Sequence, residues 1–153
     1  MINRVALANV FNETLRPLNF RRRGDNWYRR GEEIYAIVNI QRSRWDDLCY
    51  INIGFSLVDR LYGDWIPEPK CLVRFRVEAL NCVSCDTLSL LDEEKPIRMS
   101  EAERHSAIAA GIGVPVARTV GDIVDFAGLK RLLKSDMLDG GVFVHREISE
   151  MLD

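Results

Sequence analysis

The stretch NIQRSRWDDLCYINIGF, residues 39–55, decides the fold because it contains two alternating runs joined by a short polar segment. Within each run apolar residues occupy every second position, which is typical of β-strands with one buried face. A tight turn is predicted at Asp46 and Asp47. The stretch therefore indicates a β-hairpin whose two faces differ in chemistry.

This hairpin is predicted to place apolar side chains on one face and amide side chains on the other. The predicted apolar pairs are Ile40 with Ile53, Val38 with Phe55 and Ala36 with Leu57, and the predicted polar pairs are Gln41 with Asn52, Asn39 with Gly54 and Ser43 with Tyr50. Because side chains alternate with a period of two, a shift by one residue would exchange the faces. All further expectations depend on this assignment of faces.

Similar sequence patterns predict helices and strands in the rest of the N-terminal half. Residues 3–16 carry apolar side chains at helical spacing, and Pro17 is expected to end that helix. Gly31 suits the first central position of a two-residue hairpin turn. A loop carrying Trp65 is expected before the last strand. The predicted strands cover about residues 26–30, 33–44, 49–58 and 72–80.

The C-terminal half has helical character. Ser100 and Glu103 match a capping box, and the helix that they open is expected to close at Gly111. A second helix is predicted from Pro115 or Thr119 to about residue 135, and a third from near Gly141. Residues 81–99 are hard to interpret, with a short helix or strand expected around TLSLL.

Strands followed by helices indicate an α+β fold. The expected architecture is an antiparallel sheet of about four strands, with the N-terminal helix and the C-terminal helices packed on one face. Residues 1–153 are expected to form a single α+β domain. Because an antiparallel sheet tolerates water on one side, the second face is predicted to stay open.

The open face is the candidate working surface of the protein. Asn is depleted in strands, so amide side chains there suggest a need for paired hydrogen-bond donors and acceptors. Tyr and Arg are residue types that anchor protein interfaces. The alternative is a solvated face held together by cross-strand pairs. The candidate binding residues are Tyr28, Tyr35, Asn39, Gln41, Ser43, Tyr50, Asn52, Arg74 and Arg76.

Composition excludes several classes of protein. The chain has 153 residues, of which 47% are hydrophobic and 29% charged, as is ordinary for a folded domain. It has no apolar run long enough to cross a membrane and no signal-peptide pattern, so a cytoplasmic location is expected. The net charge of −2 and the acids that surround Arg21–Arg23 argue against nucleic-acid binding.

The cysteines give no strong chemical signal. CVSC at residues 82–85 has the C-x-x-C spacing, but structural zinc needs two such pairs or a pair with closely spaced histidines. A redox motif needs a helix that starts on it, and the residues after Cys85 are a poor helix start. Together with Cys49 and Cys71 these residues are predicted to be reduced thiols. No metal and no cofactor is predicted.

Other residues with catalytic potential are predicted to be structural. His105 and His145 lie in different predicted helices, and neither has a partner at ligand spacing. Asp122 and Asp125 could share a helix face, although acids near a helix start are also favoured by the helix dipole. GIGVP, residues 111–115, lacks the Lys and the Ser or Thr of a phosphate-binding loop and is predicted to be a turn between helices. No catalytic residue is predicted.

The runs PLNFRRRGDNWYRR (17–30) and IVNIQRSRWDDLCYINIGF (37–55) resemble a bacterial family known as domain of unknown function 4304. Its most specific element is an Asn-x-Gln-x-Ser strand facing a Tyr-x-Asn-x-Gly strand, whereas Asn19 departs from the Gly that is usual before Phe20. The matching residues are Leu18, Phe20, Gly24, Tyr28, Arg29, Gln41, Ser43, Tyr50, Asn52 and Gly54. The resemblance implies an α+β domain without an established reaction, and relatives that look like immunity proteins beside bacterial toxins.

Two functions from different classes are therefore expected. The first is a non-catalytic binding domain, of the immunity type, that inhibits a toxin-like protein partner by covering its active surface. The alternative is an enzyme or a small-ligand-binding protein with a pocket over the polar sheet face, which a deep pocket rather than a flat face would favour. The sequence leaves the identity of the partner and the oligomeric state open.

Overall fold

A computed structural model describes residues 2–45, 48–92 and 98–153 of the protein. Its described strands form one sheet in which spatial order follows chain order and every neighbouring pair is antiparallel. The strands are β1 (Arg21–Arg23), β2 (Asn26–Arg30), β3 (Ile34–Arg42), β4 (Cys49–Leu57), β5 (Val73–Arg76) and β6 (Phe143–Val144). The α+β class and the antiparallel sheet are confirmed. The prediction of about four strands is wrong, because the sheet has six.

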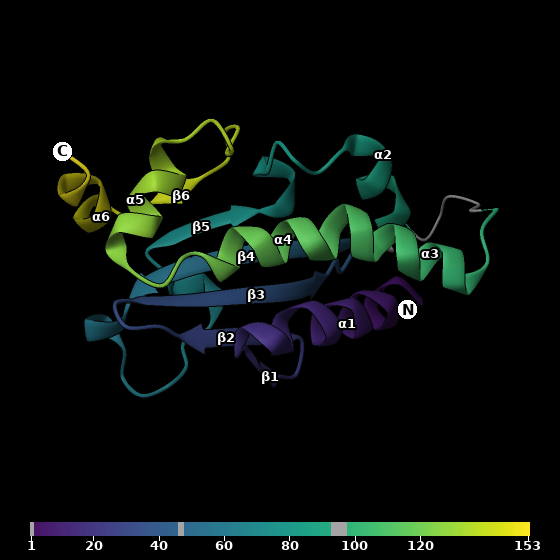
Figure 1. Ribbon diagram of the computed structural model, residues 1–153, viewed down its shortest axis with the longest axis horizontal. Coiled ribbons are helices and arrows are strands. Elements are labelled where there is room, and N and C mark those ends of the chain that lie inside the picture. Colours follow the sequence, from purple (N-terminus) through teal and green to yellow (C-terminus); the bar gives the residue numbers. More distant parts are fainter. Residues whose placement is uncertain (1, 46–47, 93–97) are drawn as a thin grey trace.

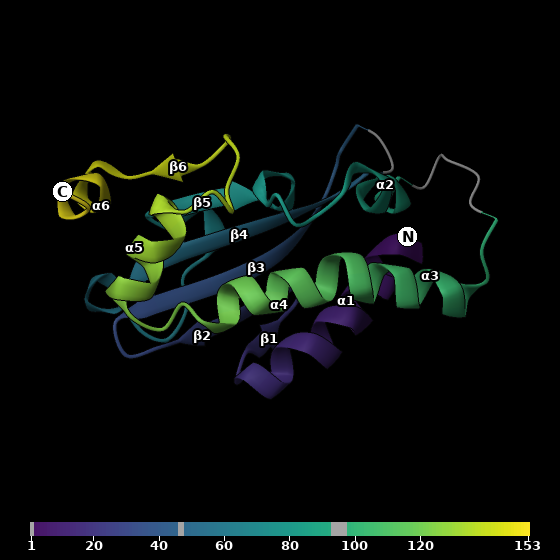
Figure 2. The same cartoon turned by 45° about the horizontal axis from the view of Figure 1, so that its top comes forward.

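The helices form a layer on one face of this sheet. They are α1 (Ile2–Leu15), α2 (Cys85–Leu88), α3 (Glu101–Ile108), α4 (Val114–Gly121), α5 (Phe126–Lys134) and α6 (Arg146–Met151). Helices α1, α3 and α4 run across the sheet on the same side, and α5 and α6 lie at the end where the C-terminus is found (Figures 1 and 2). No described helix is both long and apolar enough to span a bilayer.

The predicted phase of the hairpin is confirmed. Ile40 and Ile53 are buried in the main hydrophobic core, together with Leu7 and Phe11 of α1. Trp27 of β2 is buried on this same face, and its Nε1 donates a hydrogen bond of 3.0 Å to Asn12 Oδ1. The amide side chains of β3 and β4 consequently point away from the helices.

The register of this hairpin differs from the prediction by two residues. Observed partners are Ile40 with Ile51, Val38 with Ile53, Ala36 with Phe55, Asn39 with Asn52, and Gln41 with Tyr50. The strands are joined by a longer connection, in which Ser43 N donates to Leu48 O at 3.0 Å. The predicted turn residues Asp46 and Asp47 lie outside the described residues. A shift of two residues keeps every side chain on its face, so the face assignment was right although the pairing was wrong.

Two short edge strands account for the difference in strand number. β1 consists of three arginines, a run without apolar alternation, and it turns into β2 through Gly24 at φ 61°. β6 lies in a segment that was predicted to be helical from Gly141. Charged or very short edge strands protect a sheet against pairing with other chains.

The β2–β3 turn also differs from the prediction. Gly31 N donates to Ile34 O at 2.9 Å, so the central turn residues are Glu32 and Glu33 rather than Gly31 and its successor. A Cβ atom on Gly31 would lie 2.7 Å from Ile34 O and 3.0 Å from Val124 O. Glycine is needed here because the turn approaches the connection between α4 and α5.

Residues 111–115 continue a helix instead of forming the predicted turn. A π-helical segment, Ala109–Gly113, joins α3 directly to α4. A Cβ on Gly111 would lie 2.3 Å from Thr87 Cγ2, and one on Gly113 would lie 2.4 Å from Val10 Cγ1. The glycines therefore serve close packing within the helical layer. The capping box of Ser100 and Glu103 is confirmed.

The remaining C-terminal predictions need correction. The predicted second helix breaks after Gly121, and Asp125 caps α5 by accepting a hydrogen bond of 2.8 Å from Gly128 N. The predicted third helix begins only at Arg146, where the His145 side chain is the N-cap. β5 ends at Arg76 and continues as a 3₁₀ turn, and residues 85–91 form α2 and another 3₁₀ turn.

Arg29 connects the sheet with the helical layer. Its guanidinium donates to the carbonyl oxygens of Leu18 at 3.2 Å and Val120 at 2.9 Å, and it lies over the ring of Phe20 at 4.8 Å. Val120 is in the last turn of α4, where a cation stabilises the helix dipole. Burial lowers the pKa of Arg29, and the charge of Asp122 opposes this shift. Arg29 is thus a structural residue that connects β2 with α4.

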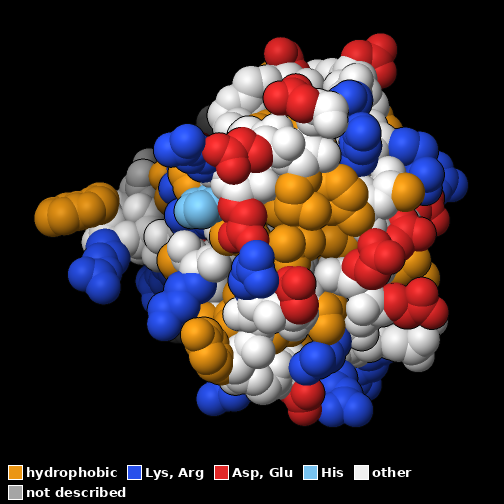
Figure 3. Space-filling view, turned by 90° about the vertical axis from the view of Figure 1, so that its left-hand side faces the viewer, with side chains coloured by type: hydrophobic (Ala, Val, Ile, Leu, Met, Phe, Trp, Pro, Cys, Tyr) orange, Lys and Arg blue, Asp and Glu red, His pale blue; other side chains and the backbone are white. Residues whose placement is uncertain are grey.

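The end of the molecule that carries α5 and α6 shows a hydrophobic area bordered by charged side chains (Figure 3). Exposed large hydrophobic residues on the elements at this end include Val124, Phe143 and Met151. Arg60 and Glu147 form an ion pair that ties the segment after β4 to α6. The hydrophobic area at this end is therefore bordered by charged groups.

Candidate binding groove

The face of the sheet opposite the helices is divided into two halves. The segment between β4 and β5, residues 58–72, folds over one half. Tyr35 and Ile37 of β3 form a second hydrophobic cluster with Cys71 of this segment. We call this half of the face the covered half. The other half, which carries Asn39 and Asn52, is not covered by that segment, and we call it the amide half.

The segment over the covered half is fixed by a buried tyrosine. Tyr35 is fully buried; its hydroxyl donates to Ile66 O at 2.8 Å and accepts from Ile66 N at 3.2 Å. Trp65 from the same segment lies against Tyr28, with ring centroids 5.7 Å apart. Burial raises the pKa of Tyr35, which keeps its hydroxyl protonated as the donor.

Gly54 allows the segment to approach the sheet. A Cβ atom at this position would lie 2.9 Å from Cys71 Sγ, 3.0 Å from Cys71 Cβ and 3.1 Å from Ile37 Cγ2. These distances leave no room for a side chain. The glycine in the Tyr-x-Asn-x-Gly strand therefore has a packing role, because it lets Cys71 lie directly on β4.

An ion pair forms the boundary between the two halves. Glu68 is buried, and its carboxylate receives hydrogen bonds from Arg74 Nε at 2.8 Å and Nη2 at 3.4 Å. The hydrogen bond to Glu68 raises the pKa of Arg74. Burial, and secondarily the charge of Glu68, raises the pKa of the Cys71 thiol to about 12. The carboxylate of Glu68 is thus neutralised within the protein.

The amide half contains a row of aligned residues that crosses five strands. In the observed register, Asn26 faces Asn39, and Asn39 faces Asn52. At the two ends of this row Arg23 of β1 faces Asn26, and Arg76 of β5 faces Asn52. We call these five residues the amide row. Its order across the sheet is Arg–Asn–Asn–Asn–Arg.

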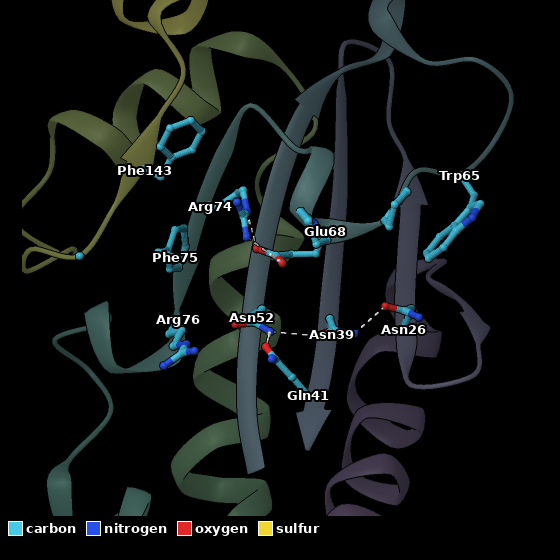
Figure 4. A pocket seen from close by; sticks show the side chains of 13 residues that line it. Asn26, Asn39, Gln41, Asn52, Trp65, Glu68, Arg74, Phe75, Arg76 and Phe143 are labelled. Carbon is cyan, nitrogen blue, oxygen red and sulfur yellow. Dashed lines mark hydrogen bonds and ion pairs between the residues drawn. The ribbon is translucent and has the colours of Figure 1, made fainter. Parts of the chain in front are cut away.

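Hydrogen bonds connect the carboxamides of this row (Figure 4). Asn39 Nδ2 donates to Asn26 Oδ1 at 2.8 Å, and Asn52 Nδ2 donates to Asn39 Oδ1 at 3.0 Å. Asn52 Nδ2 also donates to Gln41 Oε1 at 3.0 Å. The amide hydrogens of Asn52 are thereby both used, which holds its side chain in one orientation. The row is pre-organised before any ligand arrives.

Each terminal arginine of the row lies over an aromatic ring. The guanidinium of Arg76 is 4.2 Å from the ring centroid of Tyr50, and that of Arg23 is 5.0 Å from the ring centroid of Trp65. Such cation–π contacts orient a guanidinium and leave its edge available for hydrogen bonds. Both arginines are exposed, and neither forms an ion pair with a described residue.

Four residues of the amide row, Asn26, Asn39, Asn52 and Arg76, line a groove of about 790 Å³, and Arg23 continues the row beyond these lining residues. Figure 4 shows Trp65 on one side of the amides and Arg74, Arg76 and Phe143 on the other. The lining residues are Asn26, Asn39, Gln41, Asn52, Trp65, Pro67, Glu68, Pro69, Arg74, Phe75, Arg76, Gly141 and Phe143. Because Glu68 is the single acid among these described residues and is paired with Arg74, the described lining carries excess positive charge.

The structure brings five of the nine predicted binding residues together in this groove. Asn39, Gln41, Asn52, Arg74 and Arg76 all line it. The remaining four lie elsewhere: Tyr50 is half-buried beneath Arg76, Tyr28 and Tyr35 belong to the covered half, and Ser43 is half-buried at the end of β3. The prediction of an open face is wrong at Tyr35, because residues 58–72 bury it.

The sequence-based reading missed several lining residues. Asn26 lies two residues before Tyr28 and therefore on the same face of β2, so the β2–β3 register could have identified it as a groove residue. Glu68 comes from an irregular segment whose path local patterns do not specify. Arg23, which ends the amide row without lining the groove, lies in an unpredicted strand. Gly141 and Phe143 were assigned to a helix. Trp65 was predicted to lie in a loop, without a place in the candidate binding surface.

The described residues offer little else with catalytic potential. Within residues 2–45, 48–92 and 98–153, no group of three or more His, Cys, Asp or Glu could hold a metal ion. Cys82 and Cys85 are exposed free thiols. Helix α2 nevertheless begins at Cys85 with Ser84 as its N-cap, so the prediction of a poor helix start was wrong. His105 Nε2 lies 3.1 Å from Glu13 Oε2.

These features define an α+β domain that carries a groove on the free face of an antiparallel sheet. A family model described as Domain of unknown function (DUF4304) matches residues 11–112, and the chain belongs to this family. The matched region includes the whole amide row and residues 58–72, but not Gly141 and Phe143. No curated protein and no solved structure matches the chain.

Proposed function

We propose that the protein is a non-catalytic binding domain that takes up a protein partner in the groove of the amide half. The observation that carries this proposal is the hydrogen-bonded amide row, because three carboxamides are held ready on the floor of an open groove. Pre-organised polar groups lower the entropic cost of binding. Residues 58–72 and 141–143 supply walls on either side.

The chemistry of the lining supports binding rather than catalysis. None of the lining residues is a Ser, Thr, Cys, His or Lys, the usual nucleophiles and bases of enzymes. The one carboxylate, that of Glu68, already accepts two hydrogen bonds from Arg74. Amides, guanidiniums and aromatic rings remain, and these groups recognise polar partners without reacting.

An immunity-type role is a finer form of this proposal. The family resemblance implies relatives beside bacterial toxins, and the partner would then be a toxin-like protein whose active surface is covered. The groove supports such a role in general terms, because Arg76 and Trp65 are interface-anchoring residue types. The immunity-type role would be tested by expressing the protein in cells together with a toxin from a neighbouring gene and measuring whether the cells survive.

A small-ligand-binding protein or enzyme is the second candidate. It is supported by the groove volume of about 790 Å³, which lies within the range of ligand pockets. Such a ligand would contact Gln41 and Asn52 on the floor. A thermal-shift screen with small molecules would favour this candidate if a compound stabilised the wild-type protein but did not stabilise a variant in which a large side chain fills the groove.

A pair of neighbouring substitutions tests the proposed site. Gln41→Trp places a large ring in the groove, whereas Arg42→Trp places the same ring on the opposite face, because side chains alternate along β3. Peptides selected on the wild-type protein from a random displayed library should bind Gln41→Trp about tenfold more weakly or worse, a loss of about 1.4 kcal/mol. Binding to Arg42→Trp should be unchanged.

Two results would contradict the proposal. One is a selection that yields no peptide whose binding depends on the groove. The other is equal binding of the selected peptides to Gln41→Trp and the wild-type protein. Circular dichroism of both variants provides the control for folding, because Gln41 and Arg42 are both exposed at the end of β3.

A further inference from the structure

We infer that the ligand of this groove is an acidic, extended peptide segment of a protein partner that lies across the strands along the amide row. The inference rests on the proposed function and specifies its ligand. Three properties of the row support it: the charge at its two ends, its length, and the hydrogen-bonding chemistry of its centre.

The charge of the groove selects for an anionic ligand. Arg23 and Arg76 end the row, and no described acidic residue pairs with either. Glu68 could have neutralised the groove, but Arg74 already holds its carboxylate. Because each terminal guanidinium lies on an aromatic ring, its position is restricted and its planar edge can receive a carboxylate.

The length of the row selects for an extended ligand. Neighbouring strands are about 4.8 Å apart, so the Cα atoms of Arg23 and Arg76 are separated by about 19 Å across four such steps. A compact small molecule cannot reach both arginines. About six residues of extended peptide span this distance. A chain with acidic side chains near both ends would therefore satisfy both arginines.

The centre of the row matches a peptide backbone. A carboxamide presents one acceptor oxygen and two donor hydrogens, which complement the N–H and C=O groups of a peptide unit. Asn39 and Asn26 each use one amide hydrogen in the described bonds, so each keeps a second one for a ligand carbonyl. Asn52 Oδ1 accepts from none of the described residues and can receive a ligand N–H.

Single-stranded nucleic acid is also anionic and extended, but the groove suits it less well. Binding of that kind needs aromatic rings on which bases can stack. Here Tyr50 is covered by Arg76, and Trp65 lies between Arg23 and Tyr28. These two rings are already engaged within the protein, and among the described lining residues Phe143 is the exposed ring that remains, whereas base stacking along a strand uses several rings. Peptide units, in contrast, require the carboxamides that the groove does offer.

The test is a nuclear magnetic resonance titration of the ¹⁵N-labelled full chain at low salt. The probe is a blocked octapeptide of alternating Glu and Gly, and the readout is the side-chain NH₂ signals of Asn26, Asn39 and Asn52. We expect saturable shifts of these signals. The double variant Arg23→Ala/Arg76→Ala should bind about tenfold more weakly, since it removes both exposed guanidiniums that would pair with the carboxylates of the peptide.

A matched variant controls for non-specific charge effects. Arg118→Ala/Arg146→Ala removes the same charge from exposed positions outside the groove, and we expect it to bind like the wild-type protein. An octapeptide of alternating Gln and Gly should bind more weakly than the Glu peptide. Glutarate and octathymidylate, which represent small anions and nucleic acids, should also bind more weakly.

The inference is overturned if the Glu peptide does not bind or if both double variants lose affinity for it equally. It is also overturned if the Gln peptide, glutarate or octathymidylate binds as tightly as the Glu peptide does. Its failure can be told apart from failure of the proposed function. If the display selection yields peptides that bind in the groove but lack acidic residues, the proposed binding function stands and only the inference of an acidic ligand is rejected.

Discussion

The two halves of the free sheet face are built from the same strands, but one half is buried and the other lines an open groove. In the covered half, Tyr35 and Ile37 are buried beneath residues 58–72, whose Cys71 packs against them. In the amide half, a few residues further along the same strands, Asn39, Gln41 and Asn52 line an open groove. The difference shows that the free face is neither a plain solvated surface nor a second core, because a single segment divides it.

The dividing segment, residues 58–72, also helps to fix the positions of side chains in the amide half. Tyr35 and Gly54 fix the segment on the sheet, and Glu68 at its end orients Arg74 toward the groove. The apolar cluster thereby stabilises the wall of the polar site. We therefore expect substitutions in the covered half to change global stability, and substitutions in the amide half to change binding with smaller effects on stability.

The largest expected effect is that of Tyr35→Ala. Truncation of this fully buried ring should lower the free energy of unfolding by about 3–5 kcal/mol, because it leaves a cavity and removes the partner of Ile66. Tyr50→Ala in the amide half should cost about 1 kcal/mol, since Tyr50 is half-buried and its ring forms a cation–π contact with Arg76. Urea unfolding followed by circular dichroism measures both. Similar costs for both variants would mean that residues 58–72 do not seal the covered half.

Asn52→Ala should have an intermediate effect. It leaves Asn39 Oδ1 and Gln41 Oε1 without their donor, which should cost about 1–3 kcal/mol because Asn52 is buried on the groove floor. Phe55→Ala, a core truncation on the other face, should cost about 3–5 kcal/mol. If urea unfolding gave the two variants the same free energy of unfolding, the amide row would be a structural element rather than a binding site.

The sequence was sufficient to predict the faces of the sheet but not its full extent. Period-two alternation in β3 and β4 is strong, so Ile40 and Ile53 were correctly placed in the core. The length of the connection after Ser43 is not encoded in that pattern, which is why the register was predicted two residues away from the observed one. β1 and β6 were missed because edge strands need no buried face.

The site was only partly predictable for a related reason. Residues on regular strands, such as Gln41 and Asn52, could be assigned to the groove face by parity alone. The burial of Tyr35, and the positions of Trp65 and Glu68, depend on how an irregular segment folds over the sheet. Such long-range contacts leave no periodic signal in the sequence.

The last effect that we predict is absent at neutral pH and concerns the thiol of the covered half at alkaline pH. The pKa of Cys71 is raised from its ordinary value of 9.0 to about 12, first because burial disfavours the thiolate and then because Glu68 is near. The unfolded chain therefore releases this proton at a lower pH than the folded protein does. This contribution to stability is complete below pH 9 and is lost progressively as the pH rises toward 12.

Comparison with Cys71→Ala isolates this contribution from other titrations. The stability advantage of the wild-type protein over Cys71→Ala should shrink by about 1.4 kcal/mol for each pH unit above 9. Urea unfolding at pH 8 and pH 10 in the presence of a reductant would measure the change. An advantage that stays constant over this interval would show that the thiol is accessible to water, and hence that residues 58–72 do not close over the covered half.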